Sequence, residues 1–126
     1  MDPLQRIVSI VDDDLSVREA LTGLVSAFGF LAAPFASAEA FLRSSVRHKT
    51  SCLISDVNMP GLSGLALLDR LTALDQRVPP TILVSANPDQ RAHAALARGA
   101  VGYLDKPIDP DQLLLLIRTS IAAARV

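Results

Sequence analysis

Five short apolar runs alternate with five longer stretches of helical periodicity, and this alternation constrains the fold more than any other feature of the sequence. The first run, Ile7–Val11, is rich in β-branched residues, as expected of a strand that is buried on both faces. The other runs lie at 30–35, 52–54, 81–84 and 101–104. Strands that alternate with helices form a parallel sheet with helices on both faces. We therefore predict an α/β fold, a single doubly wound (βα)5 domain over residues 1–126, with the strand order 2-1-3-4-5.

Start and stop signals for helices lie between these runs. Ser16 and Glu19 have the spacing of a capping box, and Gly29 is expected to end the helix that follows. The polar stretch 47–51 is expected to lack regular structure, and Pro34 places the second strand at an edge of the sheet. The predicted starts of the later helices are Ser37, Ser63, Asn87–Pro88 and Asp109–Pro110.

Composition excludes several classes of protein. Half of the 126 residues are hydrophobic, which suits one domain with a sizeable core. The formal net charge is −1 and the basic residues are scattered, so the electrostatic pattern of a nucleic-acid-binding domain is missing. The single cysteine, Cys52, excludes an internal disulfide and is expected to be a buried structural thiol. The sequence has neither a signal peptide nor an apolar stretch of membrane-spanning length, so we expect a cytoplasmic protein without membrane contact.

Polar residues follow four of the five predicted strands. Asp12 and Asp13 follow the first strand, Asp56 ends the third, Ser85 ends the fourth and Lys106 follows the fifth. The carboxyl ends of parallel strands share one edge of the sheet, where ligands bind in folds of this class. Three carboxylates at that edge would repel one another unless a cation or protonation compensated them. Carboxylate oxygens without nearby histidine or cysteine favour a hard cation, and Mg²⁺ fits better than Ca²⁺ because protein ligands are few.

The remaining two side chains complement a phosphoryl group on Asp56. Ser85 can donate a hydrogen bond to a phosphoryl oxygen, and Lys106 can pair with it as a point charge. A carboxylate that acts as the nucleophile in phosphoryl transfer forms an acyl phosphate. A lone aspartate before Pro60–Gly61, which fits the central pair of a type II turn, could equally be a turn residue, so the interpretation depends on all of these groups together.

Four short motifs stand at the ends of the predicted strands, namely Val11-Asp12-Asp13-Asp14, Asp56-Val57-Asn58-Met59-Pro60-Gly61, Ser85-Ala86 and Tyr103-Leu104-Asp105-Lys106-Pro107. In these motifs the sequence resembles the CheY-like receiver domain of two-component response regulators. The similarity covers essentially the whole chain, and the segment 37–42 is similar to receivers of the FixJ type, which usually precede a helix-turn-helix output domain.

The resemblance implies a role for each site residue. Asp56 corresponds to the phosphoacceptor, and Asp13 and Asp56 would contact Mg²⁺ directly. Asp12 would act on the ion through water, and Asn58 would contribute its backbone carbonyl. Lys106 corresponds to the invariant lysine of the family. Ser85 and Tyr103 correspond to the switch pair, Asp14 to a position that is often acidic, and Lys106–Pro107 to a bond that is commonly cis.

The family also implies partners. A sensor histidine kinase would supply the phosphoryl group, and the protein would promote only its own phosphotransfer and autodephosphorylation rather than act as an enzyme. The surface formed by the helix that ends at Gly99, strand 101–104 and the last helix would contact an output domain, a second copy or another partner, and the expected process is transcription regulation. The domain itself would not bind nucleic acid. The run Leu113–Ile117 sweeps the full circumference of a helix, so an apolar partner surface or ordinary exposed leucines are both possible.

Two other functions compete with this interpretation. A phosphatase of the haloacid dehalogenase type also uses an aspartate at a strand end, but it needs a second acid two residues later, where this sequence has Asn58. A receiver-shaped interaction module that is never phosphorylated is the second alternative, and the presence of all five site residues counts against it. Tyr103 could also be a half-buried packing residue. Nucleotide binding is disfavoured because the sequence has no glycine-rich phosphate-binding motif.

Overall fold

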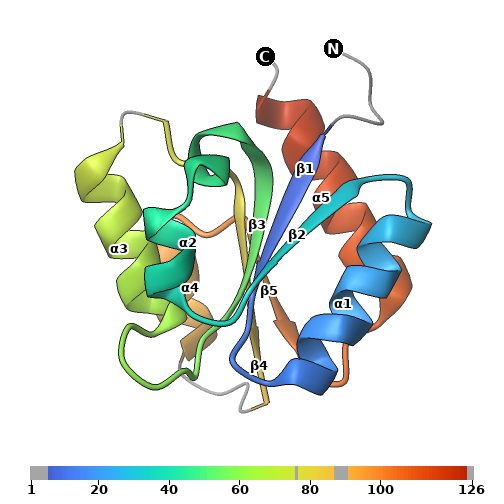
Figure 1. Cartoon of the computed structure of the whole chain (residues 1–126), viewed down its shortest axis with the longest axis horizontal. Helices are drawn as coiled ribbons and strands as arrows, with labels where there is room; N and C mark the ends of the chain where they lie inside the picture. Colours follow the sequence, from blue (N-terminus) through green and yellow to red (C-terminus); the bar gives the residue numbers. More distant parts are fainter. Residues whose placement is uncertain (1–5, 76, 87–90, 125–126) are drawn as a thin grey trace.

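A five-stranded parallel sheet forms the centre of the computed structural model, which describes residues 6–75, 77–86 and 91–124 (Figure 1). The strands are β1 (Ile7–Val11), β2 (Leu31–Phe35), β3 (Thr50–Asp56), β4 (Thr81–Ser85) and β5 (Gly102–Asp105). Their order is β2-β1-β3-β4-β5, and every neighbouring pair is parallel. The predicted topology is therefore confirmed, including the position of Pro34 on an edge strand.

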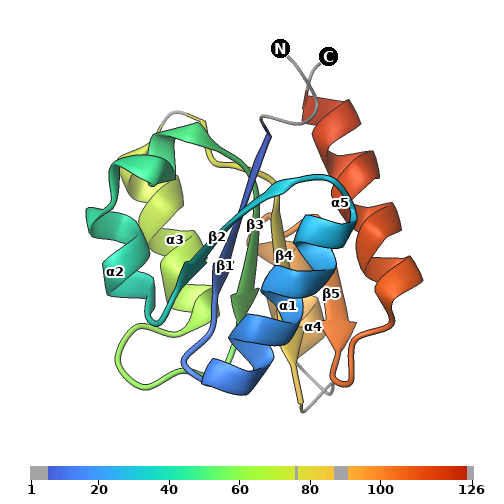
Figure 2. The same cartoon turned by 45° about the vertical axis from the view of Figure 1, so that its right-hand side comes forward.

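Helices cover both faces of the sheet. Helices α1 (Leu15–Ala27) and α5 (Pro110–Ala124) lie on one face (Figures 1 and 2). Helices α2 (Ala38–Arg43), α3 (Gly64–Leu74) and α4 (Arg91–Ala97) lie on the other. Among the described residues, no helix combines the length and apolar character needed to cross a membrane.

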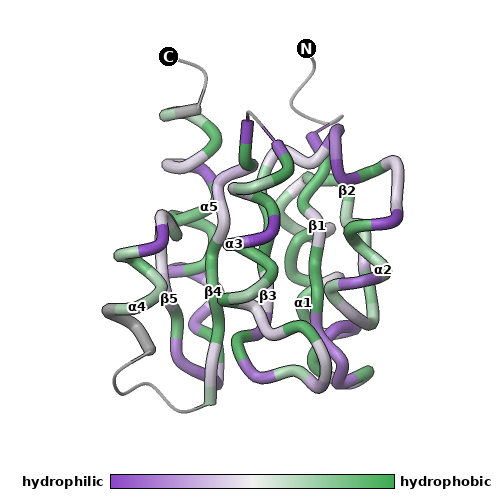
Figure 3. The backbone as a smooth tube through the Cα atoms, turned by 90° about the vertical axis from the view of Figure 1, so that its left-hand side faces the viewer, coloured by the Kyte–Doolittle hydropathy of each residue, from purple (hydrophilic) through white to green (hydrophobic). Residues whose placement is uncertain are grey.

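The core is divided by the sheet into two layers. The alternation of side chains along each strand sends successive residues to opposite faces, so Val8 and Ile10 pack with α1 and α5 whereas Val11 packs with α2 and α3. Figure 3 shows the hydrophobic residues concentrated along the strands, while hydrophilic residues concentrate in the connecting segments. Because strands β3 and β4 are buried along nearly their whole length, the positions of the residues at their carboxyl ends are well fixed.

Two predictions of local structure are wrong. Helix α1 begins at Leu15 rather than after Ser16, because the Asp14 carboxylate accepts hydrogen bonds from the backbone N–H groups of Ser16 (2.9 Å) and Val17 (3.2 Å) and is the N-cap. The stretch after α2 contains a 3₁₀ helix, Ser45–Lys49, and β3 begins immediately after it. The caps Ser37 and Ser63 are confirmed, and the predicted start at Asn87–Pro88 lies outside the described residues.

The leucine-rich run of α5 has both buried and exposed members. Leu113 and Ile117 are fully buried, whereas Leu115 is 67% exposed. Leu116 packs over Gly102 of β5, where an added Cβ would lie 2.8 Å from the Leu116 side chain. Leu115 is thus the exposed leucine of this run, while Leu114 and Leu116 are half-buried, and both interpretations of the run remain open.

The only cysteine is a structural core residue, as expected. Cys52 is fully buried in β3, and its sulfur lies 3.8 Å from the Ser120 hydroxyl. Burial raises the pKa of this thiol to about 12, although the hydrogen bond to Ser120 lowers it slightly. The thiolate, which is the reactive form, is therefore disfavoured at neutral pH.

Candidate functional site

The strand register brings the predicted site residues to one edge of the sheet. Val11 pairs with Ser55, so the next residues on these strands, Asp12 and Asp56, are neighbours. Asp56 pairs with Val84, so Ser85 lies one residue further along β4. Backbone hydrogen bonds extend this alignment: Val57 N–H donates to the Val84 carbonyl and Lys106 N–H donates to the Ser85 carbonyl, both at 2.9 Å. The clustering that the sequence predicted follows from this parallel register.

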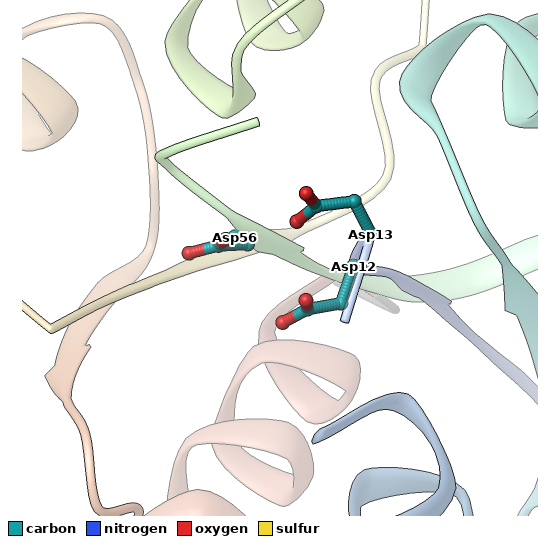
Figure 4. Close-up of side chains that lie close together, drawn as sticks. All are labelled: Asp12, Asp13 and Asp56. Atoms are coloured by element: carbon teal, nitrogen blue, oxygen red, sulfur yellow. The ribbon is translucent and has the colours of Figure 1, made fainter. Parts of the chain in front are cut away.

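Three carboxylates meet at this edge. Asp12, Asp13 and Asp56 each offer one ligand oxygen, and these oxygens lie within 4.8 Å of one another (Figure 4). Asp12 is 1% exposed and Asp56 is 6% exposed, whereas Asp13 is open to solvent. The cluster thus has two buried acids and one acid at the mouth.

Lys106 is the cation that faces the two buried acids. Its Nζ atom lies 3.3 Å from Asp12 Oδ2 and 3.4 Å from Asp56 Oδ1. Burial raises the pKa of Asp56; Lys106 opposes this effect, and the nearby Asp12 charge adds to it. Burial alone would lower the pKa of Lys106, but the attraction of Asp56 and Asp12 outweighs it and the pKa is raised. One ammonium group therefore compensates the acids only in part, and the protein holds excess negative charge here.

Asp12 is already engaged through both of its carboxylate oxygens. Oδ1 accepts a hydrogen bond from the Asp14 backbone N–H at 2.9 Å, and Oδ2 contacts Lys106. The Asp12 backbone carbonyl accepts a further hydrogen bond from Arg18 Nη1 at 2.8 Å. These contacts fix Asp12. Asp56 is engaged in a similar way, by Lys106 and by a hydrogen bond from the Asn58 backbone, so the exposed Asp13 is the acid with the most freedom to bind a cation directly.

The donor set fits a small hard cation. Three carboxylates supply oxygen ligands, and no histidine or cysteine belongs to the cluster that the described residues form. Excess negative charge between buried acids favours a divalent ion, and a site with few protein oxygens suits Mg²⁺, which retains several water ligands.

The loop after β3 is shaped by two glycines. Gly61 has a φ of +76°, the value required at the second central position of the predicted type II turn. Gly64 begins α3 directly against Asp56, where an added Cβ would collide with the Asp56 backbone carbonyl. The sequence signalled Gly61 through the adjacent proline, but nothing in it signalled the close approach of Gly64.

The predicted switch residues lie on the two strands beyond β3, Ser85 at the end of β4 and Tyr103 within β5. Ser85 is fully buried, and its Oγ accepts a hydrogen bond from Asn58 Nδ2 at 3.3 Å. Tyr103 is half-buried on β5 and packs against the cluster that contains Leu83 and Ala100. The Lys106–Pro107 bond is cis, the isomer that the resemblance implied.

A cavity adjoins the site on the side of α1. It has a volume of about 290 Å³ and is mainly apolar. Its lining residues come from α1 and from the segment after β5, namely Ser16, Val17, Ala20, Leu21, Leu24, Lys106, Pro107 and Ile108. The sequence did not predict this cavity, because it depends on how the segment 106–108 lies across α1.

Comparisons with known proteins agree with this geometry. Residues 8–118 match the family described as response regulator receiver domain. The chain is 35% identical to the transcriptional regulatory protein FixJ of Bradyrhizobium diazoefficiens over 93% of this chain and 57% of that protein. It is 38% identical to the response regulator protein TmoT of Ectopseudomonas mendocina over 98% of this chain and 56% of that protein. The chain thus spans about half the length of these relatives.

Solved structures show the same similarity. The crystal structure of FixJ-N has a TM-score of 0.84 and 30% identity, and the match covers 97% of this chain and 96% of that chain. The structure of the response regulator StyR has a TM-score of 0.85 and 34% identity over 94% of this chain and 60% of that chain. A family match over most of the sequence, together with this fold and this cluster of acids, shows that the chain belongs to the response regulator receiver domain family of two-component systems.

Proposed function

We propose that this chain accepts a phosphoryl group on Asp56 from a phosphohistidine of a sensor histidine kinase. The observation that carries the proposal is the arrangement of the Asp56 carboxylate, which lies 3.4 Å from Lys106 Nζ and within 4.8 Å of the Asp12 and Asp13 oxygens. An aspartate that merely capped a turn would not need a buried position, a facing lysine and two further acids.

The residues of this chain position the reaction rather than supply acid–base chemistry. An Asp56 oxygen attacks phosphorus, the P–N bond of the donor breaks, and its electron pair stays on the imidazole, which then takes up a proton. Lys106 balances the negative charge that gathers on the phosphoryl oxygens, and the Ser85 hydroxyl donates a hydrogen bond to one of them. The product is an acyl phosphate.

We assign the metal-binding role to Asp13, Asp56 and the backbone carbonyl of Asn58, with Asp12 acting through water. The burial of Asp12, which is 1% exposed, and the contacts of its two oxygens with the Asp14 N–H and Lys106 support its indirect role. Bound Mg²⁺ would neutralise the charge that the phosphoryl group adds to this acidic edge.

The proposal extends to the output of the domain. Phosphorylation would draw Ser85 toward Asp56, and Tyr103 would turn inward behind it. The face formed by α4, β5 and α5 would then change its preferred partner. The change would be a shift in population between an unphosphorylated and a phosphorylated conformation. The exposed Leu96, Val101 and Leu115 belong to these elements or border them. An output domain that regulates transcription, or a second copy, would bind this face. Because the kinase makes phosphohistidine from ATP, the chain would act in the cytoplasm.

Incubation with acetyl phosphate and Mg²⁺, followed by intact-mass measurement, tests the proposal. We expect a gain of one phosphoryl group in the presence of Mg²⁺. No gain is expected when a chelator is present throughout the incubation. An unchanged mass would favour an interaction module that is never phosphorylated. Repeated turnover of a phosphate ester without a stable adduct would favour the haloacid dehalogenase-type phosphatase, against which Asn58 already argues.

Replacing Ala20 by arginine is expected to separate a protein donor from a small-molecule donor. Ala20 is exposed and lines the apolar cavity that reaches Lys106, so a kinase that delivers phosphohistidine to Asp56 would place an apolar side chain there. Phosphotransfer from the kinase should fall at least about tenfold, the effect of losing about 1.4 kcal/mol of binding. The rate with acetyl phosphate should not change. Ala123→Arg, on an exposed position of α5, is the matched control, and equal loss with both donors would contradict the prediction.

Replacing Asp56 by asparagine should also change the pH dependence of stability in EDTA. Because the pKa of Asp56 is raised, the folded state holds this proton more tightly than the unfolded chain does. The resulting stabilisation is complete below the ordinary aspartate pKa of about 4 and is lost as the pH rises through the raised pKa. The unfolding free energy of the wild type minus that of the variant should therefore decrease from about pH 4 to neutral pH. Urea unfolding at several pH values measures this difference, and an increase with pH would contradict it.

A further inference from the structure

The hydrogen bond between Asn58 and Ser85 links two strand ends of the site. Asn58 Nδ2, in the loop after β3, donates to Ser85 Oγ at the end of β4, at a distance of 3.3 Å. Asn58 is exposed, whereas Ser85 is fully buried. The hydroxyl that the proposed function assigns to the phosphoryl group is therefore already held by a neighbouring amide.

The backbone around Ser85 cannot easily follow a change of partner. The Ser85 carbonyl accepts from Lys106 N–H and the preceding Val84 carbonyl accepts from Val57 N–H, both at 2.9 Å. These bonds tie the end of β4 to both neighbouring strands. Movement of the hydroxyl toward a group on Asp56 thus falls on the Ser85 side chain, and rotation of that side chain would move Oγ relative to Asn58 Nδ2.

We propose that the Asn58 side chain is a positioning residue that retains Ser85 in its unphosphorylated position. This inference rests on the proposed function, because it gives the hydrogen bond a role only if Ser85 later binds the phosphoryl group. Part of the interaction between the phosphoryl group and Ser85 is then used to break the bond to Asn58. The role belongs to the side-chain amide and is separate from the backbone carbonyl of Asn58.

The expected change in affinity follows from the free energy that one hydrogen bond contributes. A ligand that binds only the released arrangement has an apparent affinity lowered by the fraction of molecules in that arrangement. A single neutral hydrogen bond at a partly exposed position corresponds to an effect of about two- to fivefold. Loss of the Asn58 amide should therefore strengthen binding of a phosphoryl mimic by about this factor.

Titration with beryllium fluoride in the presence of Mg²⁺ tests the inference. Asn58→Ala should bind about two- to fivefold more tightly than the wild type, and the same substitution should have no effect in a Ser85→Ala background. Weaker binding by Asn58→Ala would show that the amide contacts the phosphoryl group itself and would overturn the proposal. An equal gain with and without the Ser85 hydroxyl would also overturn it, since Asn58 would then act only by obstructing access.

A measurement without phosphate analogue separates this inference from the proposed function. In the free protein, Ser85→Ala should shift the side-chain amide NMR signals of Asn58, and unshifted signals would refute the hydrogen bond. Failure of the wild type to bind beryllium fluoride would refute the proposed function. Binding by the wild type with no gain in Asn58→Ala would refute only the retaining role of Asn58.

Discussion

Replacing Asp56 by asparagine is expected to abolish phosphoryl incorporation from acetyl phosphate and from a sensor kinase. An amide oxygen is a far weaker nucleophile than a carboxylate, and the other two acids of the cluster are less suited to replace it. Asp12 is 1% exposed and is held by the Asp14 N–H and Lys106, and Asp13 lies at the exposed mouth. Intact-mass measurement after incubation with Mg²⁺ should show no adduct.

Asp69→Asn is the matched control for this substitution. Asp69 lies on α3, pairs with Arg98 at 3.4 Å and has a side chain that is 55% exposed, so it has no role at the site. This variant should incorporate phosphate as the wild type does. An adduct that persisted in Asp56→Asn at the wild-type level would mean that another residue accepts the phosphoryl group.

Replacing Lys106 by methionine is expected to slow phosphoryl incorporation by about 100-fold, the lower end of the loss seen when one preorganised donor to a developing charge is removed. Methionine keeps much of the length of the lysine side chain and removes its charge. Because Lys106 lowers the pKa of Asp56, the variant should also show an Asp56 pKa above that of the wild type. Single-turnover kinetics and an NMR titration of the Asp56 carboxyl carbon measure the two effects.

The chain offers a close control for Lys106→Met. Its other lysine, Lys49, is exposed on the 3₁₀ helix before β3, so Lys49→Met removes the same charge away from the site. Lys49→Met should incorporate the phosphoryl group at the wild-type rate. If both variants lost the same activity, the effect would come from net charge and not from contact with Asp56.

The topology could be predicted because it depends on periodicity along the whole chain. Apolar runs that alternate with helical stretches leave few arrangements, and the right-handed crossover rule removes most of these. Boundaries that depend on one side chain were harder to predict. Asp14, rather than Ser16, is the cap of α1 because its carboxylate reaches two N–H groups, and both residues are acceptable caps by sequence.

The site was predicted at the level of residues but not of contacts. Asp12, Asp56, Ser85 and Lys106 could be placed because each ends a strand or directly follows one. The engagement of both Asp12 oxygens and the bond from Asn58 to Ser85 depend on side-chain geometry between different strands, which no pattern within one segment encodes.

A crystal structure with Mg²⁺ and beryllium fluoride tests the central claim most directly. The account predicts the metal between the carboxylates of Asp13 and Asp56, and the beryllium adduct on Asp56 within reach of Ser85 and Lys106. A pocket that remained empty at saturating concentrations, or an adduct on another residue, would contradict it.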